Sequence, residues 1–135
     1  MKAAGLIASA ALLSMAMTGT AGAASPSSLN VDNRNNGQTI TVHQGQRLHV
    51  VLYSTYWTIN GGHNQAVRVV SAQQFFPDNR SAGCHAGSGC GYVSRDFLAT
   101  SPGSATLTAA RTTCGEALRC APSQSSWTLT VRVQR

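Results

Sequence analysis

Four segments of the sequence alternate apolar and polar residues with a period of two. They cover residues 39–42, 47–52, 106–109 and 127–133, with Thr, Arg or His at most positions of the polar parity. Successive side chains of a β-strand point to opposite faces of its sheet, so this pattern predicts strands with one buried face and one solvated face. After residue 28, no stretch of useful length repeats its apolar residues with a helical period. The pattern therefore predicts an antiparallel all-β protein.

Weaker strand candidates lie at residues 29–31, 57–60, 67–71 and 92–100. The last of them carries bulky residues on both parities, which indicates either a bulge or burial on both faces. Turn-prone runs rich in Gly, Asn and Pro separate the segments, and about seven short strands punctuated in this way favour a β-sandwich. Its expected core is formed by the apolar parities: Ile40, Val42, Leu48, Val50, Leu52, Leu107, Leu129, Val131 and Val133.

The N-terminus has the pattern of a secretory signal peptide. Met1-Lys2 is followed by an apolar and small-residue run at 3–17, and Ala21-Gly22-Ala23 fits the small-x-small cleavage rule. The run is shorter than the ~20 apolar residues that a membrane span needs. We therefore expect a signal peptide at 1–23, a short linker at 24–28 and a β-sandwich domain at 29–135, secreted and without a membrane span after cleavage.

Charged residues make up only 10% of the chain, with ten Lys and Arg against four Asp and Glu. A nucleic-acid-binding domain gathers its basic residues on one face or element, whereas the arginines here stand singly along the sequence. The few acids, the lack of a G-x-S-x-G motif and the lack of a Gly-rich loop opening a helix leave no catalytic set. We expect no nucleic-acid partner, no cofactor and no enzymatic activity.

Four cysteines form two C-x5-C pairs, Cys84 with Cys90 and Cys114 with Cys120. Two disulfides are the expected state in an exported chain. The spacing favours these two local loops, but crossed pairing stays open because the two arrangements differ by only about 1 kcal/mol per link in loop-closure entropy. Structural zinc sites prefer shorter C-x2–4-C spacings, so no metal is expected.

Thr113-Cys114-Gly115-Glu116 has the pattern of a helix capping box, with Thr113 as N-cap and Glu116 at the third helical position. It predicts a single helical turn through Ala117 and Leu118. A regular helix would hold Cys114 and Cys120 about 9 Å apart, farther than a disulfide spans. The helical turn is therefore expected to end near Leu118.

Aromatic residues are concentrated in Tyr53-Ser54-Thr55-Tyr56-Trp57, directly after a predicted strand. Trp57 is expected in the core at the start of the next strand. Two tyrosines of one short loop cannot easily both point inward, so at least one is expected at the surface, where aromatic side chains mark recognition sites. Phe75-Phe76 is interpreted as the end of a core strand.

The order of strands and loops over residues 37–133 resembles that of the chagasin-type inhibitors of papain-like cysteine proteases. Ser54-Thr55-Tyr56 and Gly87-Ser88-Gly89 stand where that family has two inhibitory loops, and Arg111-Thr112-Thr113-Cys114 replaces its Arg-Pro-Trp motif. The chain also resembles small exported immunoglobulin-like domains of bacteria. The resemblance implies an immunoglobulin-like fold and a non-catalytic role in protease inhibition.

By position, the three loops of this resemblance are Tyr53–Trp57, Gly83–Gly91 and Arg111–Gln124, and both cysteine pairs lie within them. Stapling a loop lowers the cost of ordering it on binding, so we expect a binding end for a protease or another extracellular protein. The alternative is a module that binds cell-wall polymer or glycan, or a structural or accessory exported domain. The candidate ligand-binding residues are Tyr53, Thr55, Tyr56, His85, Arg111 and Arg119.

Overall fold

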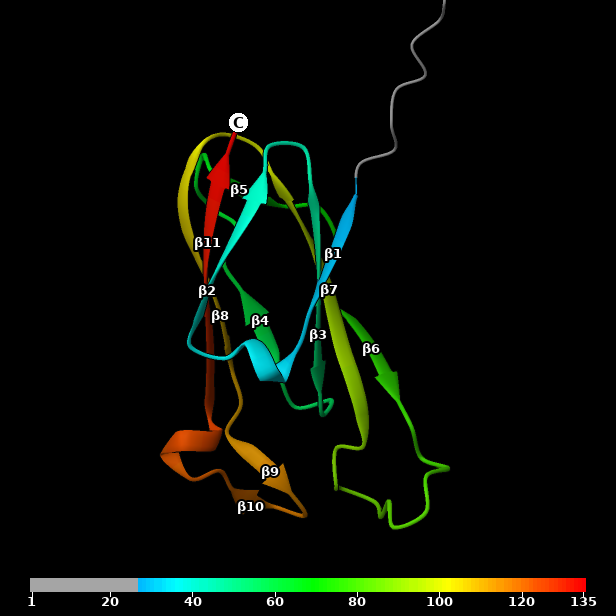
Figure 1. Cartoon of the computed structure of the whole chain (residues 1–135). Helices are drawn as coiled ribbons and strands as arrows, with labels where there is room; N and C mark the ends of the chain where they lie inside the picture. Colours follow the sequence, from blue (N-terminus) through cyan, green and yellow to red (C-terminus); the bar gives the residue numbers. More distant parts are fainter. Residues whose placement is uncertain (1–26) are drawn as a thin grey trace, which may run out of the picture.

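The computed structural model describes residues 27–135 (Figure 1). The predicted signal peptide at 1–23 and residues 24–26 of the predicted linker lie outside the described residues. The first strand, β1 (Ser28–Val31), begins one residue before the predicted start of the domain. Within the described part, no helix is long and apolar enough to span a membrane.

Two packed β-sheets and a small hairpin make up the fold. The first sheet has the order β1–β3–β7–β5, and β6 pairs with β7 on the edge that β5 also uses; the second has the order β2–β11–β8–β4. Beyond β1, the strands of the first sheet are β3 (Arg47–Tyr53), β5 (Val67–Val69), β6 (Gln74–Pro77) and β7 (Gly91–Ala99). The strands of the second are β2 (Gln38–His43), β4 (Thr58–Asn60), β8 (Gly103–Ala110) and β11 (Ser126–Gln134).

All pairings inside the two sheets are antiparallel except those of two edge strands. β1 runs parallel to β3, and β2 runs parallel to β11. A 3-10 turn, η1 (Asn33–Asn35), carries the chain from one sheet to the other between them. The N-terminal segment therefore closes one edge of both sheets, and the predicted immunoglobulin-like β-sandwich is confirmed.

The core between the sheets is formed by the predicted apolar parities. Eight of the nine predicted core side chains are buried, and Ile40 is half-buried against them. Trp57, Phe97 and Trp127 add the large aromatic volume. Trp57 lies in the core as predicted, directly before β4.

The segment 92–100, whose two parities both carry bulky residues, forms the long central strand β7. Its register with β3 is regular from Tyr92 to Leu98, so there is no bulge there, and the bulky residues of the second parity, Tyr92 and Leu98, are half-buried. Val93 and Phe97 are buried toward the second sheet, and Ser94 is buried on the opposite face. Arg95 has the same parity as Val93 and Phe97, and its guanidinium donates to Ile59 O at 2.6 Å. This hydrogen bond connects β7 to β4 in the opposite sheet.

The interpretation of Phe75-Phe76 as the end of a core strand is wrong. Both residues lie in the exposed edge strand β6, where Phe75 is 59% exposed and Phe76 39%. The Phe76 ring stacks on Tyr92 with ring centroids 4.6 Å apart. Two consecutive apolar residues show no periodicity, so the sequence cannot distinguish a buried strand from an edge strand. Phe75 and Phe76 are exposed because β6 lies at the edge of the sheet.

The predicted helical turn after Thr113 is also wrong. This segment is a β-hairpin of β9 (Thr113–Gly115) and β10 (Leu118–Arg119). Its turn residues Glu116 and Ala117 have φ of +40° and +64°, the left-handed values of a two-residue type I′ turn. An antiparallel hairpin brings Cys114 and Cys120 together, which a helix cannot do, so the cross-link prevails over the capping pattern.

Candidate functional site

The three loops of interest lie together at one end of the sandwich, opposite the C-terminus (Figure 1). Residues 53–57 connect β3 to β4, residues 83–91 return the chain from β6 into β7, and residues 111–124 connect β8 to β11 through the hairpin and η2 (Pro122–Gln124). We call this end of the molecule, formed by these three loops, the loop end.

The first loop is tied down at its aromatic residues. Trp57 is buried, and its indole N–H donates to Tyr53 O at 3.0 Å, so the loop closes on its own backbone. Tyr53 itself is 61% exposed, and Tyr56 is half-buried. One of the two tyrosines is therefore at the surface, as predicted, and the other packs inside the loop end.

Tyr56 packs on the second loop. Its hydroxyl donates to Gly87 O, and a Cβ on Gly89 would lie only 2.4 Å from the tyrosine ring. Two backbone bonds follow the same seam, from Thr55 N to Gly89 O at 2.9 Å and from Ser54 N to Gly91 O at 2.8 Å. The first two loops are thus joined as an irregular extension of the sheet.

The third loop contacts both of the others. The Glu116 N–H at the hairpin turn donates to Gly87 O at 2.7 Å. The Arg111 guanidinium lies over the Trp57 ring, 4.4 Å from its centroid, and its Nε donates to Gln124 O at 2.9 Å. The loop end is consequently one connected surface, in which each loop is held by contacts with the other two.

Two disulfides staple the second and third loops. Cys84 is bonded to Cys90 and Cys114 to Cys120, with Cα atoms 6.1 and 4.9 Å apart. The local pairing is confirmed, and the crossed alternative is excluded. Each bond closes its loop across a sequence separation of six residues.

We expect the native protein to carry no thiol that reacts with iodoacetamide before reduction. All four cysteines of the sequence are accounted for by these two bonds. Mass spectrometry after alkylation without reductant checks this, and peptide mapping should recover each cross-link within its own loop. A labelled cysteine on folded protein, or a peptide joining residue 84 or 90 to residue 114 or 120, would contradict the arrangement.

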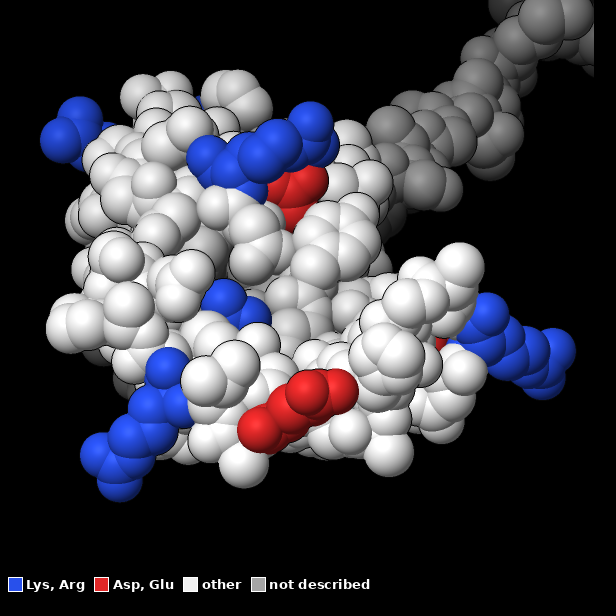
Figure 2. Space-filling model, turned by 90° about the horizontal axis from the view of Figure 1, so that it is seen from below, with Lys and Arg blue, Asp and Glu red and all other residues white. Residues whose placement is uncertain are grey.

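Charges at the loop end are dispersed. Seen from below, basic side chains stand apart from one another, one near the middle of the face and the others toward its outline, and acidic ones lie between them (Figure 2). The Arg34 guanidinium, 2.7 Å from the carboxylate of Asp32, lowers the pKa of that acid, and hydrogen bonds from the Ser81 hydroxyl and the Arg80 N–H lower the pKa of Asp78. Asp32 is thus paired with a cation within the chain, whereas Asp78 is hydrogen-bonded only by neutral donors and keeps its negative charge.

The structure places all six candidate binding residues at the loop end, in different environments. Tyr53, His85 and Arg119 are exposed, and Thr55, Tyr56 and Arg111 are half-buried in the contacts between loops. The His85 side chain makes no hydrogen bond with any of the other five, and the hydrogen bonds of its backbone go to Ser88. Among residues 27–135, no group of three or more His, Cys, Asp or Glu is arranged to hold a metal ion.

Sequence reasoning missed Leu118, which is 68% exposed on β10. The capping pattern assigned this leucine to a helical turn, and only the hairpin shows that its side chain is presented to solvent. Asn33 and Asn36 were missed too, because they approach Arg111 only in the folded chain, where they share a hollow with it. No local signal marks either asparagine.

Together these observations define an immunoglobulin-like sandwich with three connected loops at one end. Two solved structures share this fold at low sequence identity. EhICP2, a cysteine protease inhibitor from Entamoeba histolytica, has a TM-score of 0.57 and 8% identity over 83% of this chain and 100% of its own. Amebosin, known from a solution structure, has a TM-score of 0.53 and 17% identity over 81% of this chain and 99% of its own. No protein-family model and no curated protein matches the sequence.

Proposed function

We propose that this chain is a secreted, non-catalytic inhibitor that inserts its loop end into the active-site cleft of a papain-like cysteine protease. The observation that carries the proposal is the joining of three loops, two of them stapled, at one end of a sandwich with the fold of a cysteine protease inhibitor. Secretion fits the two disulfides, which persist in oxidising compartments.

Preorganisation supports this proposal physically. Binding costs free energy whenever loops must be ordered, and rigid loops avoid that cost. Here the Tyr56 hydroxyl and the Glu116 N–H both donate to Gly87 O, so the middle loop is fixed from two sides before any partner arrives. Tyr53 and Leu118 then remain as exposed anchors on a braced surface.

The glycan-binding alternative has less support. Stacking on a sugar needs an exposed aromatic face. The Tyr56 ring packs against Gly89 and its hydroxyl donates to Gly87 O, so this ring is not free to stack. Tyr53 alone remains open in the first loop. Co-sedimentation with insoluble cell wall, measured beside the inhibition assay, separates the two functions.

Inhibition of papain by the purified protein, measured with a small peptide substrate, tests the proposal. We expect Tyr53→Ala to weaken binding by at least about 1 kcal/mol, as loss of an interface hot spot does. The free energy of unfolding should change little because Tyr53 is mostly exposed. Arg132→Ala, on β11 away from the loop end, is the matched control and should inhibit normally. A Tyr53 variant with full potency, or sedimentation with cell wall and no inhibition, would count against the assignment.

A further inference from the structure

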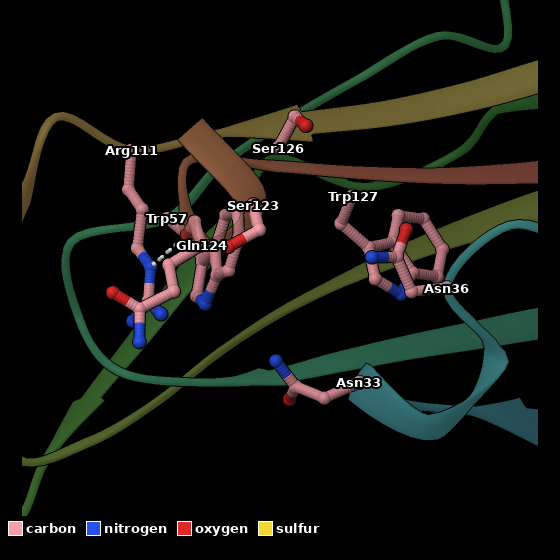
Figure 3. Close-up of a pocket in the computed structure, with 8 residues that line it drawn as sticks. All are labelled: Asn33, Asn36, Trp57, Arg111, Ser123, Gln124, Ser126 and Trp127. Atoms are coloured by element: carbon pink, nitrogen blue, oxygen red, sulfur yellow. Dashed lines mark hydrogen bonds between the residues drawn. The ribbon is translucent and has the colours of Figure 1, made fainter. Parts of the chain in front are cut away.

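A small polar hollow lies beside the loop end, between the two 3-10 turns. It has a volume of about 180 Å³, and it is lined by Asn33, Asn36, Trp57, Arg111, Ser123, Gln124, Ser126 and Trp127. Figure 3 shows Arg111 and Gln124 at one side of it, the asparagines of the η1 turn at the other, and the two tryptophans along its wall. Nothing in the contacts that join the three loops requires this hollow.

Arg111 enters the hollow without a counter-ion. Its Nε is used by Gln124 O and its face by Trp57, but neither Nη group has a hydrogen-bond partner among residues 27–135. In the same part of the chain, Asp32 pairs with Arg34 and Asp96 is hydrogen-bonded to His49, and no carboxylate reaches Arg111. Burial without a neighbouring acid lowers the pKa of Arg111. An anion bound beside such a partly desolvated guanidinium stabilises it, because the anion supplies the negative partner that the chain lacks there.

Two asparagines on the opposite side of the hollow add further donors. Asn33 Oδ1 accepts from Tyr53 N at 2.8 Å, and Asn36 Oδ1 accepts from Thr128 N at 2.9 Å. Both carboxamide oxygens are therefore occupied, and both amide nitrogens are left without a partner within residues 27–135. In Figure 3 these nitrogens lie on the side that faces Trp57 and Arg111. The free polar groups of the hollow thus include four sets of N–H donors, from Arg111, Asn33, Asn36 and the Gln124 carboxamide, together with the serine hydroxyls; the Gln124 carboxamide oxygen is the one free side-chain acceptor without a hydrogen of its own among these lining residues. This predominance of donors suits an anion.

We propose that this hollow binds a carboxylate group, supplied by an acidic side chain of the protein that docks on the loop end. A guanidinium held over an aromatic ring and by its Nε presents its two Nη groups as a fork, which matches the two oxygens of a carboxylate. The hollow has room for one such group. The site stands on its own geometry, whereas the source of the carboxylate rests on the proposed function.

Tryptophan fluorescence offers a direct test. The chain has two tryptophans, and both line the hollow, one of them beneath Arg111. We expect sodium acetate, titrated at constant ionic strength, to change the emission of the full protein saturably, whereas sodium chloride and acetamide should not. Arg111→Gln should abolish the response, and Arg132→Gln should leave it intact. An equal response to chloride, or an unchanged acetate response in the Arg111 variant, would overturn the site.

Arg111→Lys keeps the charge and removes the fork, and it serves where Arg111→Gln does not fold. We expect at least tenfold weaker acetate binding and an inhibition constant for papain raised at least tenfold, with Arg132→Lys within twofold of the native protein. Full inhibition by Arg111→Lys would overturn the docking role of the carboxylate. A protein that binds acetate but inhibits no cysteine protease would overturn the proposed function and leave the carboxylate site supported.

Discussion

Replacing Leu129 by alanine is expected to lower the free energy of unfolding by about 2–5 kcal/mol, the range for truncating a leucine in a packed core. Leu129 is fully buried at the centre of β11, where it pairs with Leu107 on β8. Its removal leaves a cavity between the two sheets that the surrounding strands can fill only in part. Urea unfolding of the native protein and the variant measures the difference.

Arg132→Ala on the same strand is the control for this prediction. Its side chain is on the solvent parity, so the change should stay within about 0.5 kcal/mol, as for surface positions generally. A neutral Leu129→Ala beside a destabilising Arg132→Ala would mean that the faces of β11 are exchanged, since a one-residue shift in register turns every side chain over.

Gly91→Ala is the second substitution expected to have a large effect. Gly91 has φ of +106°, and a Cβ there would lie 2.0 Å from Phe76 O, an impossible contact with the backbone of β6. The residue begins β7, and its own carbonyl oxygen accepts from Ser54 N. We expect a loss of several kcal/mol, because backbone strain of about 1–3 kcal/mol adds to the separation of β6 from β7.

Gly37→Ala separates these two causes. Gly37 also has a positive φ, of +74°, but a Cβ there meets no atom within 4 Å. Gly37→Ala should therefore lower the free energy of unfolding only by the cost of holding an alanine in the left-handed conformation, about 1–2 kcal/mol. Thermal unfolding of both variants checks the comparison, and equal losses at the two positions would show that the contact with β6 contributes nothing.

Much of the fold could be predicted from the sequence because period-two alternation is a local property. The alternation assigns one parity of each strand to the core, and the side chains on that parity are buried, among them Val50, Leu52 and Leu129. The two equal C-x5-C spacings favour local disulfides, but only the folded chain decides against crossed pairing. The parallel edge pairing of β2 with β11 could not be predicted, because it depends on where the N-terminal segment changes sheets and no single strand carries that information.

The site was predictable only in outline. The positions of the three loops follow from the strand order, but their mutual contacts are non-local. Tyr56 reaches Gly87 across 31 residues. The capping pattern at Thr113 and Glu116 predicts a helical turn, but the segment forms a hairpin that the Cys114–Cys120 bond closes. The exposure of Leu118 and the hollow around Arg111 depend on that hairpin and on the fold, so sequence patterns alone could not reveal them.

In the proposed function, the loop end would occupy the active-site cleft of a cysteine protease. Protection of the protease's catalytic cysteine tests it most directly. With papain activated and then freed of reductant, the rate of alkylation by iodoacetamide is followed as the inhibitor is added, and the inhibitor itself offers no free thiol to the reagent. We predict that the rate falls saturably with native protein and falls less with Tyr53→Ala. An alkylation rate unchanged at saturating protein would contradict the account.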